Sequence, residues 1–239
     1  MRPQKITTCY LCGKPLSGRK VDEDDDHVPP KQLLAKELRR KYQIRLVTLR
    51  THQACNSSFN LDEEYFKHCL IPFARGSEAG DAIWRKAVRE YWSGEKVRLV
   101  DHVLRQAKPV LNGVLLPRGK VWLDYDRSRI DRVIGKIIKG LHYADTREVI
   151  TLPANLGTSI TFPGQRPPDD FIEIMSTFPT ESRGEHQGVF AYRSNVAGDL
   201  HYWSMLLWDR IIITACFRTL TERQTEVAAP STTFSTPSA

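Results

Sequence analysis

Two short pairs of zinc-compatible residues constrain this chain more than any other feature. Cys9 and Cys12 form the first pair, and His52 and Cys55 form the second. Each pair has two intervening residues, and structural zinc takes four tetrahedral ligands from thiolates and imidazoles, commonly as two close pairs. The spacing therefore predicts one structural zinc that closes residues 13–51 into a loop.

Other residues could supply or replace ligands of this zinc. His68 and Cys69 lie shortly after the second pair and are competing ligands. The alternative for Cys55 and Cys69 is that they are small buried residues without a metal, since free cysteine behaves as a small apolar side chain.

The composition bears on the expected cellular compartment and on the role of the cysteines. The 239 residues include five cysteines and carry a net charge of +7. Without an apolar leader or an apolar run long enough to cross a bilayer, the chain is expected to be cytoplasmic, with no membrane partner. In that reducing compartment, five cysteines favour metal binding over disulfides.

Basic residues gather between the two zinc pairs. Residues 31–50 hold seven lysines and arginines against the single acid Glu37. A local basic excess favours polyanions, because each cation placed near a phosphate releases a condensed counterion. The alternative is an ordinary solvated helix face. The candidate nucleic-acid contacts are Lys31, Arg39, Arg40, Lys41 and Arg45.

A carboxylate, an imidazole and an amide accompany the zinc pairs. Asp26 and His27 precede Val28-Pro29-Pro30, and Asn56 directly follows Cys55. A zinc that fixes Cys55 would hold Asn56 near the loop that carries Asp26, and their oxygens suit magnesium or manganese. His27 has the pKa of a general base. The pattern predicts a catalytic metal at Asp26 and Asn56, whereas a surface salt bridge and a helix cap are the plainer alternatives.

Taken in order, these segments resemble the HNH endonuclease family, in its zinc-stapled branch with a ββα-metal fold. The resemblance covers residues 9 to about 70 and includes His27–Lys31, Cys55-Asn56 and Asp62–Phe66. It implies that His27 is the general base, that Asp26 and Asn56 hold the catalytic metal, and that zinc is structural. The implied zinc ligands are Cys9, Cys12, His52 and Cys55.

The chain departs from the family pattern at two positions. No asparagine lies between His27 and Cys55, so Gln43, Thr48 or a backbone carbonyl would take the middle place of the motif. The position four after Asn56, often histidine or lysine in the family, is Asn60, which could offer an oxygen to the metal. His68 is a further candidate ligand there.

The expected fold class is α+β. We divide the chain into an HNH unit (1–75), a helical region (76–145), a β-rich region (146–222) and a disordered Ser/Thr/Pro-rich tail (223–239). Helical periodicity predicts helices in 33–41, from 60, in 78–108 with a break at 93–94, and in 128–143 capped by Ser128. β-prone runs predict strands at 44–49, 121–125, 149–152, 171–174, 188–193 and 208–217.

The leading functional hypothesis is a metal-dependent endonuclease that cuts DNA. One alternative is a zinc-stapled nucleic-acid-binding module without hydrolysis, and another is a defence nuclease gated by a signal. In the gated case, Tyr202, Trp203 and Trp208 could form a base-stacking or ligand surface, although aromatic residues in a β region are more often core. DNA is the expected partner. RNA, a small-molecule activator and a homodimer stay open.

Overall fold

The computed structural model describes residues 8–118, 121–153, 156–177, 181–184 and 188–219. The expected disordered tail, 223–239, lies outside these residues. The fold is mixed α/β, and buried residues from the start, middle and end of the chain form one hydrophobic core. No helix in the described ranges is both long and apolar enough to cross a membrane.

The N-terminal part is built on an antiparallel hairpin of β1 (Glu23–Val28) and β2 (Val47–His52). The register pairs Asp26 with Leu49 and His27 with Thr48. The short helices η1 (Lys31–Leu33) and α1 (Lys36–Lys41) fill the connection. The second strand was predicted at 44–49. It begins at Val47 instead, and the N–H of Ile44 donates to the carbonyl of Arg39 at 3.1 Å, which holds residue 44 against the end of α1.

Helices follow the hairpin directly. They are α2 (Gln53–Ser57), α3 (Asn60–Leu70), η2 (Ile71–Phe73), α4 (Glu78–Trp92) and α5 (Val97–Arg105). The predicted break at 93–94 is confirmed. Trp92, the last residue of α4 before the break, is 87% exposed.

Two small antiparallel ribbons lead to the long helix α6 (Arg127–Thr146). They are β3 (Ala107–Lys108) with β6 (Trp122–Leu123), and β4 (Val110–Leu111) with β5 (Val114–Leu115). The predicted cap of α6 was Ser128. Instead Asp126 caps it, since its carboxylate accepts from the backbone N–H groups of Ser128 and Arg129.

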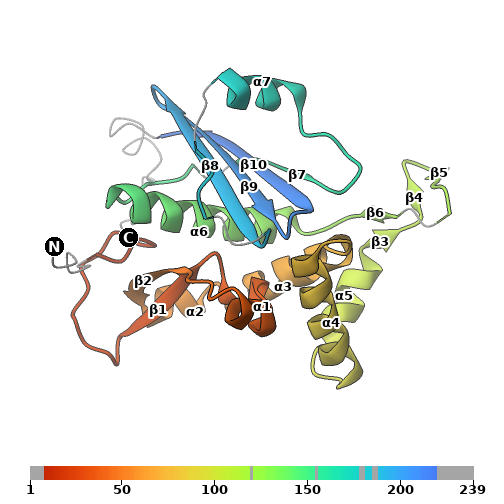
Figure 1. Cartoon of the computed structure of the whole chain (residues 1–239), viewed down its shortest axis with the longest axis horizontal. Helices are drawn as coiled ribbons and strands as arrows, with labels where there is room; N and C mark the ends of the chain where they lie inside the picture. The colour runs from red at the N-terminus through yellow and green to blue at the C-terminus, as the bar shows by residue number, and fades with distance from the viewer. Residues whose placement is uncertain (1–7, 119–120, 154–155, 178–180, 185–187, 220–239) are drawn as a thin grey trace, which may run out of the picture.

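Helix α6 lies between the hairpin and the C-terminal sheet (Figure 1). Its apolar residues Ile130, Val133, Ile134, Ile137, Ile138 and Leu141 are all buried. A Cβ at Gly140 would overlap the side chain of Val28, so glycine at this point allows α6 to approach β1 closely. This approach brings the middle of α6 next to the residues singled out around Asp26.

The C-terminal sheet is antiparallel, with the order β7-β10-β9-β8. Its strands are β7 (Gly157–Thr161), β8 (Phe190–Ala197), β9 (Leu200–Leu207) and β10 (Ile211–Arg218). The strand predicted at 171–174 was wrong, because these residues lie in helix α7 (Asp169–Thr177), whose first turn carries two acids that complement the helix dipole. Residues 149–152 form no strand either.

The aromatic residues proposed as a ligand surface belong largely to the core. Trp203 and Trp208 are buried, and only Tyr202 is partly exposed. Trp208 Nε1 donates to the carbonyl of Leu33 at 2.7 Å, and Ser77 Oγ donates to the carbonyl of Trp208 at 2.5 Å. Trp208 therefore joins the sheet to the N-terminal part of the chain.

Replacing Trp208 with alanine is expected to destabilise the whole protein by about 3–5 kcal/mol. The change removes a fully buried indole and leaves the Leu33 carbonyl without its donor. Urea unfolding followed by circular dichroism would measure the change. Trp92→Ala is the matched control and should cost little, because that indole is exposed. Equal losses in both variants would contradict this assignment.

Candidate metal centre and adjoining polar pocket

The four zinc-compatible residues meet where β2 ends and α2 begins. One ligand atom from each of Cys9, Cys12, His52 and Cys55 lies within 4.8 Å of the others. Nδ1 of His52 is 3.4 Å from Sγ of Cys12 and 3.9 Å from Sγ of Cys55. Ligands of a tetrahedral zinc lie roughly 3.5–3.8 Å apart. The group is thus a candidate metal site, and its donor set fits zinc.

Local backbone structure prepares both halves of this site. The N–H of Gly13 donates to the carbonyl of Cys9 at 2.8 Å, and the N–H of Cys9 donates to the carbonyl of Lys14 at 3.0 Å. Gly13 has φ of 73°, which a residue with a side chain rarely adopts. His52 is the N-cap of α2, so one helical turn carries the chain from His52 to Cys55.

Hydrogen bonding selects the imidazole nitrogen that faces the thiols. Nε2 of His52 lies 3.1 Å from the carbonyl oxygen of Pro15. A carbonyl only accepts, so Nε2 carries the proton and Nδ1 presents its lone pair to Cys12 and Cys55. This is the arrangement by which an outer hydrogen bond orients a metal-binding histidine.

The competing ligands lie elsewhere. His68 is buried in α3, with Nδ1 2.7 Å from the hydroxyl of Tyr91, and burial lowers its pKa to about 4. Cys69 is also buried, and burial raises its pKa to about 11. Within the described part of the chain, neither belongs to the cysteine and histidine group around Cys9.

Beside the zinc-compatible group, oxygen atoms of three side chains accept hydrogen bonds from one buried ammonium group. Nζ of Lys136, on α6, lies 2.9 Å from Oδ2 of Asp26 and 3.0 Å from Oδ1 of Asn56. It also donates to Oε1 of Glu63 on α3. The Lys136 side chain is only 2% exposed. We call Asp26, Asn56 and Glu63 the acidic cluster. Asp26 and Asn56 come together as the sequence predicted, but around a lysine.

Neighbouring groups orient each member of the acidic cluster. The buried hydroxyl of Tyr10 donates to Asp26 at 2.6 Å. The amide nitrogen of Asn56 donates to Asp24 at 3.1 Å, which turns the amide oxygen towards Lys136. Burial raises the pKa of the Glu63 carboxyl, while the charge of Lys136 acts in the opposite direction.

His27 lies at the open side of this cluster. With Asp26, Asn56, Asn60 and Glu63 it lines a pocket of about 380 Å³. Burial lowers the pKa of His27, and the positive charge of Lys31 lowers it further. The imidazole is therefore neutral at pH 7 and able to accept a proton.

Neither Gln43 nor Thr48 takes the middle position of the HNH motif by hydrogen bonding to His27. Thr48 lies directly opposite His27 in the hairpin, but its hydroxyl donates to the carbonyl of Leu46 at 3.3 Å. Gln43 is exposed in the turn after α1. Within the described residues, the ring of His27 makes no hydrogen bond with either of them.

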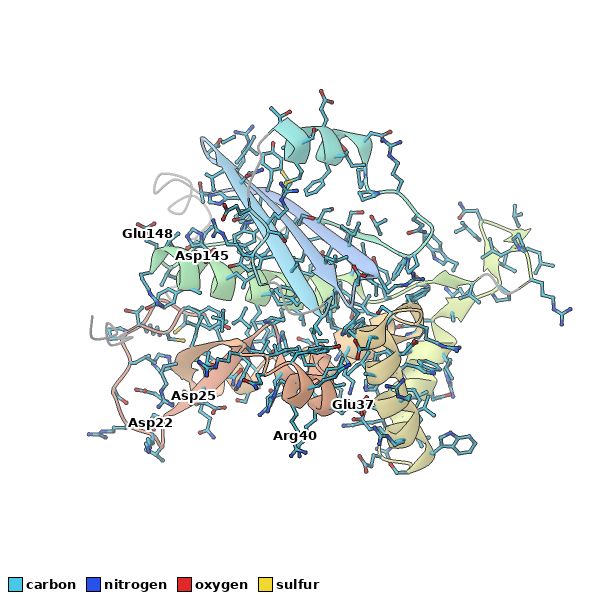
Figure 2. The ribbon with its side chains drawn as sticks, in the orientation of Figure 1. Asp22, Asp25, Glu37, Arg40, Asp145 and Glu148 are labelled. Atoms are coloured by element: carbon cyan, nitrogen blue, oxygen red, sulfur yellow. The ribbon has the colours of Figure 1, made fainter. Side chains whose placement is uncertain are left out.

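The proposed nucleic-acid contacts are arranged around α1. Lys31 lines the pocket of His27, and the charge of Arg39 also lowers the pKa of His27. Arg40 points outward from α1 (Figure 2). Lys41 instead pairs with Glu78 at 2.6 Å. Arg45 is exposed. Two of the five cations thus lie close to His27.

Replacing Arg39 and Arg40 together with alanine is expected to weaken DNA binding on every sequence. Each lost phosphate contact should flatten the slope of log affinity against log salt by about 0.9, so the pair should remove about 1.8. Fluorescence anisotropy across a salt series measures the slope. Lys41→Ala is the matched control with a smaller effect, because Glu78 already pairs with Lys41. An unchanged slope in the double variant would show that Arg39 and Arg40 do not contact the phosphates of DNA.

Sequence reasoning missed three residues of this region: Tyr10, Glu63 and Lys136. Glu63 lies on α3 whereas Asn56 lies on α2, so no spacing along one helix connects the two residues in the sequence. The helical spacing places Lys136 on a basic face that is a second candidate phosphate surface, whereas the structure buries its side chain against the acidic cluster. No local signal pointed to Tyr10 as the donor to Asp26.

Comparisons with protein-family models, with curated proteins and with solved structures found no match.

Proposed function

We propose that this chain is a metal-dependent endonuclease that hydrolyses DNA phosphodiester bonds, with an N-terminal ββα-metal unit of the HNH type. The observation that carries the proposal is the convergence of Asp26, His27 and Asn56 on one pocket beside a zinc-compatible site. The strand–strand–helix order of β1, β2 and α2 is compatible with such a unit.

The acidic cluster has the chemistry of a site for magnesium or manganese. Two carboxylates and an amide oxygen are hard donors, and all three already converge on the positive charge of Lys136. Asp26, Asn56 and Glu63 would hold the cation. Once bound, it would supply Lewis-acid stabilisation of the charge that develops on the phosphate.

The other residues of the pocket have separate roles. His27 accepts a proton from the attacking water, for which a neutral imidazole at pH 7 is suited. Lys31 and Arg39 bind the phosphates on either side of the scissile bond. Tyr10 holds the carboxylate of Asp26 in place through its 2.6 Å hydrogen bond.

A second candidate is a zinc-stapled nucleic-acid-binding module without hydrolysis, and the position of Lys136 favours it. A divalent ion roughly 3 Å from an ammonium group is repelled by about 11 kcal/mol, even at an effective dielectric constant of about 20. Lys136 and a divalent metal therefore exclude each other from the acidic cluster. In this second candidate, Lys136 remains in the acidic cluster, and the pocket binds nucleic acid without hydrolysing it.

Plasmid cleavage tests the proposal. Zinc-loaded protein is incubated with supercoiled plasmid and magnesium or manganese, with an excess of chelator added to a matched sample. The proposal expects nicked or linear product only when free divalent metal is present. Binding of the plasmid without cleavage under all metal conditions, by wild type and by Lys136→Met, would leave the binding module as the function.

A further inference from the structure

Helix α6 carries a second pocket behind the acidic cluster. This pocket, of about 610 Å³, is lined along α6 by Arg127, Arg132, Lys136 and Lys139, with Asp131 as the acid among them. Leu152, Pro153 and Leu156 form part of its opposite wall. We call it the basic pocket. Carboxylates already pair with three of these cations: Arg127 with Asp131, Arg132 with Asp62, and Lys136 with Asp26 and Glu63. Lys139 makes no ion pair among the described residues, so it is the cation available to a ligand that carries phosphate.

Lys136 connects the basic pocket to the acidic cluster. Lys136 is among the residues that line the basic pocket, whereas its three oxygen partners line the pocket of His27. Lys136 therefore stands between the two pockets, and a metal ion would reach the acidic cluster through the pocket of His27. If Lys136 moved towards the basic pocket, the oxygen atoms of the acidic cluster would lose their cation and stay accessible to a metal ion from the pocket of His27.

Phe59 lies at the boundary between the two regions. Its ring centroid is 5.2 Å from Nζ of Lys136 and 4.3 Å from the guanidinium carbon of Arg132. Arg132 is also held by Ser58 and Asp62, so it is fixed in place. Lys139 is held more loosely, since Nζ lies 3.4 Å from the carbonyl oxygen of Leu11. Lys139 is thus the cation best able to turn towards a ligand.

We propose that the basic pocket binds a phosphate group, and that this phosphate draws Lys136 out of the acidic cluster so that a divalent metal can bind there. The inference rests on the proposed metal-dependent function and adds its regulation. The phosphate belongs either to a free nucleotide or to the DNA backbone, because both present the same charge and acceptors.

The test measures the affinity for Mn²⁺ directly, from the electron paramagnetic resonance signal of free Mn²⁺, on zinc-loaded full-length protein. Sulfate serves as the phosphate probe, and chloride is the control at matched ionic strength. Wild type should bind Mn²⁺ weakly in chloride and about tenfold more tightly in sulfate. Lys136→Met should bind tightly in both.

Lys139→Met supplies the matched variant on the same helix. In chloride it should behave like wild type, because Lys139 does not touch the acidic cluster. In sulfate it should lose most of the gain in affinity. If sulfate leaves the wild-type affinity unchanged, or if Lys136→Met binds Mn²⁺ no more tightly than wild type, the proposal is overturned.

Two further measurements complete the design. If Lys136→Met does not fold, acetylation of Lys136 in the wild-type protein is followed by mass spectrometry, and labelling should rise when Mn²⁺ and sulfate are both present. Continued protection would overturn the proposal. Repeating the titration with adenosine monophosphate and with duplex DNA, against protein-free samples, identifies the source of the phosphate. Because no step requires cleavage, these results are independent of the nuclease assay.

Discussion

Replacing His27 with alanine is expected to reduce plasmid cleavage by about 10²–10⁴-fold, the usual contribution of a positioned general base. The imidazole lines the pocket with Asp26 and Asn56, and burial keeps its pKa below the ordinary value. Without it, the titratable side chains that line this pocket are four carboxylates and Lys31. Initial rates of plasmid nicking at saturating magnesium or manganese measure the effect.

DNA binding and folding should survive this change. Among the described residues, the imidazole of His27 contributes no hydrogen bond to either strand of the hairpin, so the loss of stability should be small. His102→Ala is the matched control, since that histidine is exposed on α5, where Nε2 faces Gln106 at 3.2 Å. Cleavage by His27→Ala at the wild-type rate would show that another group activates the water.

Replacing Cys9 with serine is expected to abolish zinc binding and unfold the N-terminal hairpin. Structural zinc contributes about 10–16 kcal/mol of apparent binding free energy in small zinc-dependent units. That is as large as the whole stability of a typical domain, about 5–15 kcal/mol. Cys9 is fully buried, and its thiol is one of the four grouped ligand atoms. Zinc content by mass spectrometry and thermal unfolding measure the two effects.

Cys216→Ser is the control for this experiment. Cys216 lies on β10, away from the zinc-compatible group, so this variant should keep its zinc and unfold as one cooperative unit. A Cys9→Ser protein that retains one zinc per chain at full thermal stability would refute the assigned ligand set.

Loss of the zinc should also disturb the acidic cluster. Tyr10 follows Cys9 directly, and its hydroxyl donates to Asp26. Asn56 follows Cys55 and offers its oxygen to Lys136. Each half of the zinc-compatible site is therefore joined by one peptide bond to a residue that contacts the acidic cluster.

Much of the N-terminal part could be predicted from sequence because its signals are local. The spacing of Cys9 and Cys12, and of His52 and Cys55, indicates candidate metal ligands without any knowledge of the fold. The four residues do come together, and Asn56 and Asp26 both contact the ammonium group of Lys136. The chemical roles of His27, Asp26 and Asn56 stay predictions.

Predictions of secondary structure failed where one pattern fits two structures. The run at 171–174 is apolar and branched, which is typical of a strand, yet its two preceding acids begin helix α7. The predicted boundaries of α6 were close to the observed ones, but the N-cap is Asp126 and not Ser128. The Asp126 carboxylate can accept from two backbone N–H groups. Short apolar runs do not distinguish a strand from a helix by themselves.

The sequence by itself determined the zinc-compatible ligands, because each pair has a strict spacing, and the long amphipathic helix, because its apolar residues recur at helical spacing. The approach of Asn56 to Asp26 was expected only through the zinc that would join the two ligand pairs. Only the tertiary structure decided that Lys136 fills the acidic cluster. Periodicity assigns Lys136 to the polar side of α6, and a helix that packs between a hairpin and a sheet has little solvent-facing side. A buried lysine must find anionic partners. Those partners come from β1, α2 and α3, which only the packing of the fold brings to it.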